Sequence, residues 1–168
     1  MEIANFNFYG FEIEIQTLNS DLIDLLNIDF RFFSKPGILK KKMIIEAHLN
    51  EKLDDLIPKE LVANSQSINS MTFDVGSIRY NDYYGEAVTI FDYKNESCKI
   101  YAKDINRLHE ITYLLMLSRQ GKLCDRKGLH KIHAMAVSKN NKNLVLMLPM
   151  KGGKTTLFTR FLSNKEIG

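Results

Sequence analysis

The chain has 168 residues and a mass of 19.4 kDa, with 45% hydrophobic and 26% charged residues. This length suffices for one ordinary domain, or for a compact subdomain and part of another. Because the chain has only 9 Gly and 3 Pro, and spreads 10 Phe and 7 Tyr along its length, it is neither collagen-like nor disordered. No apolar run approaches the roughly 18 residues of a membrane span, and the first residues do not resemble a secretory signal. We therefore expect a soluble, cytoplasmic protein with no membrane segment.

The two cysteines, Cys98 and Cys124, could in principle pair. However, 7 methionines and no export signal favour a reducing compartment. We therefore expect two buried thiols.

The net charge of +3 hides an asymmetry between the two halves of the chain. Residues 1–92 carry 8 Lys+Arg against 15 Asp+Glu, a net charge of −7, whereas residues 93–168 carry 15 against 5, a net charge of +10. A basic half fits a polyanionic ligand such as a nucleotide phosphate, a nucleic acid or a lipid head group. The alternative is that the two halves attract each other, and charge alone does not decide between these interpretations.

The first elements follow from alternating apolar residues. Phe6 and Phe8 share one face, and residues 11–15 alternate again after a change of phase at Tyr9-Gly10, which predicts two short strands joined by a bulge or tight turn. Asn19 then precedes leucines and isoleucines at helical spacing, as an N-cap does, so a short helix is expected there.

The next stretch is predicted to be mainly β-structure up to about residue 103. Short strands are expected at residues 30–33 and 43–49, separated by the turn sequence Lys35-Pro36-Gly37. Residues 71–103 indicate several antiparallel strands that end in a hairpin. We therefore expect a β meander with one early helix.

The apolar period then changes to that of a helix. This helix is expected to begin after Asp104, its N-cap, and to stop at Gly121. Two strands follow, at residues 132–138 and 144–148, and the short connection between them requires an antiparallel pair.

Residues 144–157 form the most informative stretch: a buried strand, a glycine-containing turn, and then Lys154, Thr155 and Thr156 at the start of an apolar helix. This order gathers backbone N–H groups and a positive helix end around one point, which favours a bound phosphate. The match to the phosphate-loop pattern is incomplete, because Leu148 stands at the first glycine position. The motif assigns Lys154 to the β and γ phosphates and the Thr155 hydroxyl to Mg²⁺. The residues expected to hold the nucleotide are Gly152, Gly153, Lys154, Thr155 and Thr156.

Three segments carry a resemblance to a known family: Leu117 to Gly121, Gly128 to Val137, and Leu148 to Leu157. Over about fifty residues, from Thr112 to Leu162, the chain resembles the HPr kinase/phosphorylase-related proteins of bacteria, whose P-loop domain is also similar to phosphoenolpyruvate carboxykinase. A His-Ala strand 21 residues before the P-loop lysine makes the resemblance more specific than the P-loop alone.

The resemblance implies an α+β or α/β protein with a β-rich N-terminal subdomain (residues 1–103) and the start of a mixed-sheet P-loop kinase domain (residues 104–168). It implies transfer of a phosphoryl group from ATP, with Mg²⁺, to a hydroxyl of a protein or peptide. It also implies that His133 is a catalytic residue near the phosphates. A satisfied structural histidine is the alternative at this position.

The family places a pair of aspartates on the strand after the P-loop helix, and only 12 residues follow Thr156. We therefore expect this chain to be the N-terminal part of a longer enzyme, or to work with a second polypeptide, and to be inactive alone. A nucleotide-dependent protein-binding module is the alternative function, and nucleic-acid binding through the basic half is a less favoured third. A homo-oligomer remains open.

Overall fold

The computed structural model describes residues 1–34, 43–130, 132, 134–149 and 151–163. The chain is a mixed α+β protein with a large, mostly antiparallel sheet and three helices in its described part, which confirms the broader fold prediction. It divides into two compact units, Met1–Leu123 (unit 1) and Cys124–Gly168 (unit 2), and each is described below by itself.

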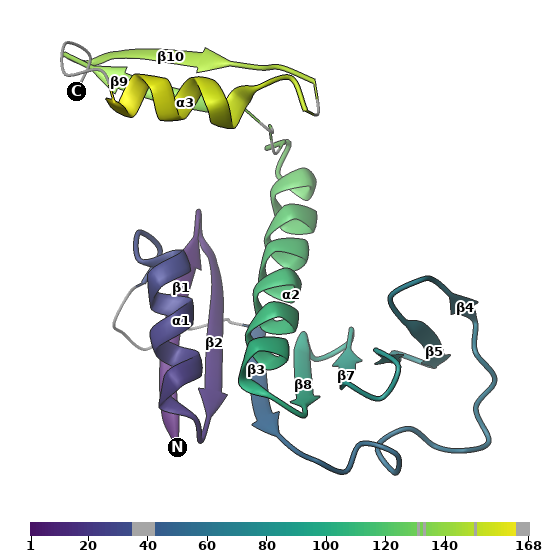
Figure 1. Cartoon of the computed structure of the whole chain (residues 1–168). Helices are drawn as coiled ribbons and strands as arrows, with labels where there is room; N and C mark the ends of the chain where they lie inside the picture. Colours follow the sequence, from purple (N-terminus) through teal and green to yellow (C-terminus); the bar gives the residue numbers. More distant parts are fainter. Residues whose placement is uncertain (35–42, 131, 133, 150, 164–168) are drawn as a thin grey trace. The chain divides into compact units, whose positions relative to one another are not determined.

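Unit 1 is built on an eight-stranded sheet with the strand order β1-β2-β3-β8-β7-β6-β5-β4. Helices α1 (Ser20–Phe30) and α2 (Ile105–Arg126) lie against one face of it (Figure 1). The strands are β1 (Glu2–Phe8), β2 (Phe11–Thr17), β3 (Met43–Leu49), β4 (Ser65–Gln66), β5 (Met71–Val75), β6 (Ile78–Asp82), β7 (Ala87–Asp92) and β8 (Ser97–Ala102).

The centre of this sheet differs from the expected meander. β3 pairs in parallel with both β2 and β8, while the remaining neighbours are antiparallel. The predicted strands at residues 43–49 and in residues 71–103 are confirmed, as is the hairpin β7–β8. The meander prediction fails at β3 because helix α1 carries the chain from β2 to β3, and such a crossover allows a parallel pair.

The turn between β1 and β2 is the predicted tight turn. Tyr9 and Gly10 adopt φ values of 55° and 86°, as in the two-residue hairpin turns whose twist matches that of the strands. Consequently the two strands bring their apolar residues onto the same face. Four of these side chains are buried: Phe6, Phe8, Ile13 and Ile15.

Helix α1 begins as predicted, because the side-chain oxygen of Asn19 accepts a hydrogen bond from the N–H of Asp21 at 3.0 Å. The strand predicted at residues 30–33 is wrong. Phe30 is the last residue of α1 and continues the buried helical spacing of Leu22 and Leu26. Its ring packs edge-on to the ring of Phe8 and is stacked with Tyr113, so helical packing overrides the local β preference. The predicted turn at residues 35–37 lies outside the described residues.

Helix α2 also begins at its predicted N-cap, since the Asp104 carboxylate accepts from the N–H of Arg107 at 2.9 Å. The predicted stop at Gly121 is wrong, because the helix continues through it to Arg126. Gly128, with φ of 72°, ends the helix instead: the N–H of Leu129 donates to the carbonyl of Cys124 at 2.9 Å. This contact belongs to the Schellman motif, in which glycine supplies the left-handed residue.

The buried residues of α2 explain the division into units. Leu108, Ile111 and Met116 belong to one apolar core with residues of the sheet such as Ile45 and Ile100. The sequence suggested a boundary between residues 103 and 104, whereas the compact units divide between Leu123 and Cys124.

Unit 2 contains a strand hairpin and one helix. Strands β9 (Met135–Lys139) and β10 (Lys142–Leu146) pair antiparallel, as predicted, and a two-residue turn joins them, in which Asn140 and Asn141 have φ of 51° and 60°. The predicted burial of the second strand is wrong, because the residues of β10 are exposed or half-buried. Helix α3 (Lys154–Ser163) lies alongside this hairpin (Figure 1).

No helix within the described ranges is long and apolar enough to cross a membrane. Both cysteines are buried thiols outside a disulfide, which confirms the expectation. Burial raises the pKa of the Cys98 thiol from 9.0 to about 12. The thiol is therefore kept protonated in the folded chain at neutral pH.

This shift predicts a pH dependence of stability. The pKa of the Cys98 thiol is 9.0 in the unfolded chain and about 12 in the folded chain. A rise of pH between these values therefore favours the unfolded chain. The stability contributed by the protonated Cys98 thiol is fully present below pH 9.0 and is lost as the pH rises toward about 12. We expect the urea midpoint to fall above about pH 9, and to fall less in Cys98→Ala, which isolates this thiol from other titrating groups. An equal fall in both proteins would contradict the buried, protonated state.

Candidate phosphate-binding loop

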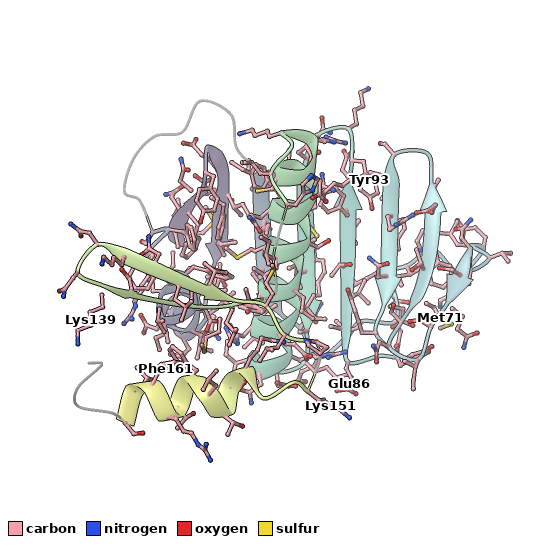
Figure 2. All side chains as sticks on the ribbon, turned by 90° about the horizontal axis from the view of Figure 1, so that it is seen from above. Met71, Glu86, Tyr93, Lys139, Lys151 and Phe161 are labelled. Carbon is pink, nitrogen blue, oxygen red and sulfur yellow. The ribbon has the colours of Figure 1, made fainter. Side chains whose placement is uncertain are left out.

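The segment between β10 and α3 folds into a tight loop. The N–H of Gly152 donates to the carbonyl of Pro149 at 3.0 Å, which closes a turn. Lys151 and Gly153 lie in the left-handed region, with φ of 61° and 81°. Lys151, labelled in Figure 2, lies in this loop, and Phe161 lies on the helix that follows. Two left-handed residues within three positions turn the backbone sharply enough for it to curve around a small group.

Gly152 is required by the close approach of the backbone. A Cβ atom at this position would lie 2.9 Å from the carbonyl oxygen of Pro149 and 3.1 Å from the Cβ of Leu148. No side chain fits at the first of these distances without movement of the backbone. The glycine therefore allows the turn to close.

The ammonium group of Lys154 is held against the start of the loop. Its Nζ atom donates to the carbonyl of Leu148 at 2.6 Å and to that of Pro149 at 3.0 Å. The side chain is half-buried and therefore folds back over the loop that precedes its own helix. Because a lysine ammonium has three donors, the third remains to meet an anion at the same place.

The start of α3 adds backbone donors to this loop. The N–H of Leu157 donates to the carbonyl of Gly153 at 2.9 Å and begins the helical hydrogen bonds. The amides of Lys154, Thr155 and Thr156 precede that bond, at the positive end of the helix dipole. A hollow of about 340 Å³ lies beside them, lined by Lys154, Thr155, Phe158 and residues 134–136. The arrangement can bind a phosphate-sized anion.

The structure gathers five of the predicted site residues into one loop and helix turn, namely Gly152, Gly153, Lys154, Thr155 and Thr156. The predicted catalytic residue His133 lies outside the described residues. His130 is exposed, and its Nδ1 atom lies 3.3 Å from a carboxylate oxygen of Asp125, as suits a surface histidine.

Two groups of the site could not be predicted from a motif, because they are backbone carbonyls and a motif describes side chains. The oxygens of Leu148 and Pro149 hold the Lys154 ammonium, although the residue types at these positions carry no polar side chain. The only signal in the sequence is Pro149 itself, which disfavours a longer strand before the loop.

Thr155 is the residue expected to bind Mg²⁺. Its side chain is exposed beside the hollow, where the hydroxyl could bind a cation that also binds phosphate oxygens. Among the described residues, no group of three His, Cys, Asp or Glu side chains is placed to hold a metal ion. The Thr155 hydroxyl therefore fits a cation that phosphate oxygens would help to hold.

Comparison with models of protein families, with curated proteins and with solved structures finds no match to this chain. The family resemblance therefore remains an expectation from the motifs.

The loop geometry predicts the effect of Gly152→Ala. The new Cβ would displace the carbonyl of Pro149, so the turn should open and its amides should exchange with solvent faster. We expect hydrogen–deuterium exchange in the peptide covering residues 147–157 to increase several-fold, with peptides of unit 1 unchanged.

Lys151→Ala is the matched control, because alanine tolerates the native φ of Lys151 no worse than lysine does. Equal exchange in Gly152→Ala and the native chain would contradict the tight turn.

Proposed function

We propose that the loop of unit 2 binds the phosphates of ATP. The single observation that supports this most strongly is the Lys154 ammonium, which folds back onto the carbonyls of Leu148 and Pro149 beside the amides that begin α3. A positive charge, a helix start and a glycine-dependent turn around one hollow are the features that phosphate recognition needs.

Each residue has a defined part in this proposal. Lys154 neutralises the β and γ phosphates, and the amides of residues 153–156 donate to their oxygens. The Thr155 hydroxyl binds Mg²⁺, and that cation, when bound, draws charge from the phosphate oxygens. The tight turn at Gly152 keeps these donors in place, so little reorganisation is needed on binding.

We further propose phosphoryl transfer to a protein or peptide hydroxyl, with His133 near the phosphates. The support is the family resemblance of the His-Ala strand and the loop. Such transfer also needs carboxylates that bind Mg²⁺ and accept the proton of the hydroxyl. In this proposal they come from a further part of the catalytic domain or from a second chain.

The apolar surface of unit 2 supports that part of the proposal. A hollow of about 680 Å³ separates α3 from the β9–β10 hairpin, and Phe158, Phe161 and Leu162 line it with Leu144. Leu144 and Leu162 are 51% and 69% exposed. A contiguous exposed apolar surface marks a place where further structure or a partner packs.

A second candidate function is a nucleotide-dependent protein-binding module without turnover. Leu148 favours it, because this bulky residue stands where the phosphate-loop pattern has its first glycine. Such a module would bind ATP without phosphorylating an acceptor.

Lys154→Ala tests the binding step. The loss of a charge-assisted contact should weaken ATP affinity by on the order of 1.5 to 3 kcal/mol, or roughly 10- to 150-fold. Isothermal titration calorimetry of the full chain with Mg²⁺ and ATP measures it. Lys142→Ala is the control, since it removes the same charge from β10 and should leave the affinity unchanged.

Equal effects of the two substitutions would contradict a phosphate role for Lys154. Transfer of radiolabelled phosphate to a protein or peptide by the native chain, assayed with the polypeptide proposed to supply the carboxylates, and not by Lys154→Ala, would favour the kinase over the binding module.

A further inference from the structure

A groove in unit 1 lies between α2 and strands β6 and β7, on the face of the sheet that carries the helices. Its volume is about 330 Å³. Phe91 and Tyr93 lie along its floor, and Leu114 and Lys122 of α2 line its wall. Leu114 is 51% exposed, so the wall offers apolar surface that the unit itself does not cover.

Three cations surround the ring of Tyr93 at this groove. The guanidinium of Arg79 lies 5.5 Å from the ring centroid, that of Arg119 lies 5.7 Å away, and the Nζ of Lys122 lies 5.7 Å away. Each contact is within the range of a cation–π interaction. The concentration of positive charge at one aromatic side chain attracts an anion.

Only two of these cations have a carboxylate partner within the described ranges. Arg79 forms a two-bond pair with Asp74, at 2.7 and 2.9 Å, which holds the pKa of that carboxyl below its usual value. The Nη2 atom of Arg119 donates to both carboxylate oxygens of Glu96, each at 2.7 Å. Lys122 forms no ion pair in this part of the chain, so the groove keeps one uncompensated positive charge.

Arg119 adds a second observation, which is a buried donor without a partner among the described residues. The side chain is 6% exposed, and its Nε atom is buried without a hydrogen-bond partner in the described structure. A buried charged donor without an acceptor costs free energy. The base of the groove therefore has more donor capacity than its own carboxylates use.

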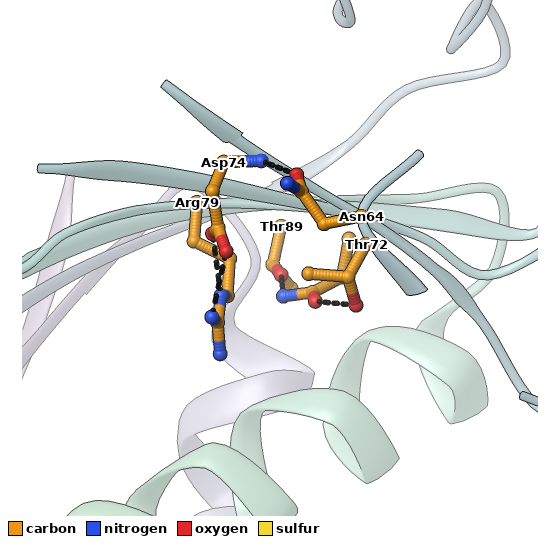
Figure 3. A network of polar contacts seen from close by, with 6 residues as sticks. Asn64, Thr72, Asp74, Arg79 and Thr89 are labelled. Atoms are coloured by element: carbon orange, nitrogen blue, oxygen red, sulfur yellow. Dashed lines mark hydrogen bonds and ion pairs between the residues drawn. The ribbon is translucent and has the colours of Figure 1, made fainter. Parts of the chain in front are cut away.

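The floor is held in shape by a polar network on the same face of the sheet (Figure 3). The hydroxyl of Thr72 donates to the side-chain oxygen of Asn81 at 3.0 Å, and the amide nitrogen of Asn81 donates to the hydroxyl of Thr89 at 2.8 Å. These bonds cross three neighbouring strands, so they fix the side chains before any ligand arrives. A preformed groove loses little entropy on binding.

We propose that this groove binds an acidic peptide segment of a partner protein. A carboxylate of the segment pairs with Lys122, and an adjacent apolar side chain packs against Leu114 and the aromatic floor. The proposal does not depend on nucleotide binding, because every residue that carries it belongs to unit 1.

The charge of unit 1 favours a short acidic peptide over a nucleic acid. Residues 1–123 carry 14 Lys+Arg against 18 Asp+Glu, a net charge of −4. A long polyanion would meet repulsion beyond the groove, whereas a segment with one or two carboxylates uses only the local positive charge.

Fluorescence anisotropy with two labelled octapeptide pools tests the proposal on the full chain. One pool carries two fixed glutamates among apolar positions, and the other carries glutamines instead. We expect the acidic pool to bind at least about fivefold more tightly, and Lys122→Glu to weaken it by at least about tenfold through charge reversal. Lys52→Glu, an exposed lysine outside the groove, should change the affinity by less than about twofold.

The variants must first show the native thermal midpoint, and Lys122→Gln replaces Lys122→Glu if the latter is destabilised. Equal binding of the two pools, equal effects of the Lys122 and Lys52 substitutions, or no binding of the acidic pool would overturn the proposal. Tighter binding of a single-stranded oligonucleotide than of the acidic pool, lost in the Lys122 variant, would overturn it in favour of a nucleic-acid site.

Discussion

The contact between the Lys154 ammonium and the carbonyls of Leu148 and Pro149 is the interaction on which the functional account depends. It holds the ammonium of Lys154, the first residue of α3, over the preceding loop. The positive charge and the first amides of α3 therefore lie at the same place. The contact in turn needs the turn at Gly152, where a side chain would meet the Pro149 carbonyl at 2.9 Å. A lysine at the start of a helix without this turn would extend into solvent, and the segment would be an ordinary helix cap.

The two units differ in how they bury apolar surface. Unit 1 has a contiguous core between its sheet and α1 and α2, in which Phe6, Leu26 and Ile100 are fully buried. Helix α3 of unit 2 has no buried residue. Unit 1 is therefore packed around its own core and presents a preformed groove. Unit 2 has a formed loop, and its exposed apolar surface marks a place where further structure or a partner packs. The proposed nucleotide and peptide sites therefore rest on separate parts of the chain.

Local signals in the sequence predicted the elements whose ends are set by side chains close in sequence. Asn19 and Asp104 cap helices where expected, and the alternating residues 43–49 form a strand. The errors arise where residues distant in sequence determine the local structure. Phe30 stays helical because Phe8 and Tyr113 pack on its ring. Gly121 lies within α2, which Gly128 ends. The groove could not be predicted, since Arg119 and Glu96 are brought together only by the packing of α2 on the sheet. The loop that precedes α3 could be predicted because its residues are contiguous, whereas the contacts of Lys154 with the carbonyls of Leu148 and Pro149 depend on how that loop folds.

The most direct measurement is a titration of the full, isotopically labelled chain with Mg²⁺ and ATP, followed by the backbone amide resonances. The account predicts that the amides of residues 152–156 shift together and saturate at one affinity, while those of the unit 1 sheet remain in place. Saturating shifts confined to other residues, with the loop amides unchanged, would contradict it, as would the absence of any shift at millimolar nucleotide.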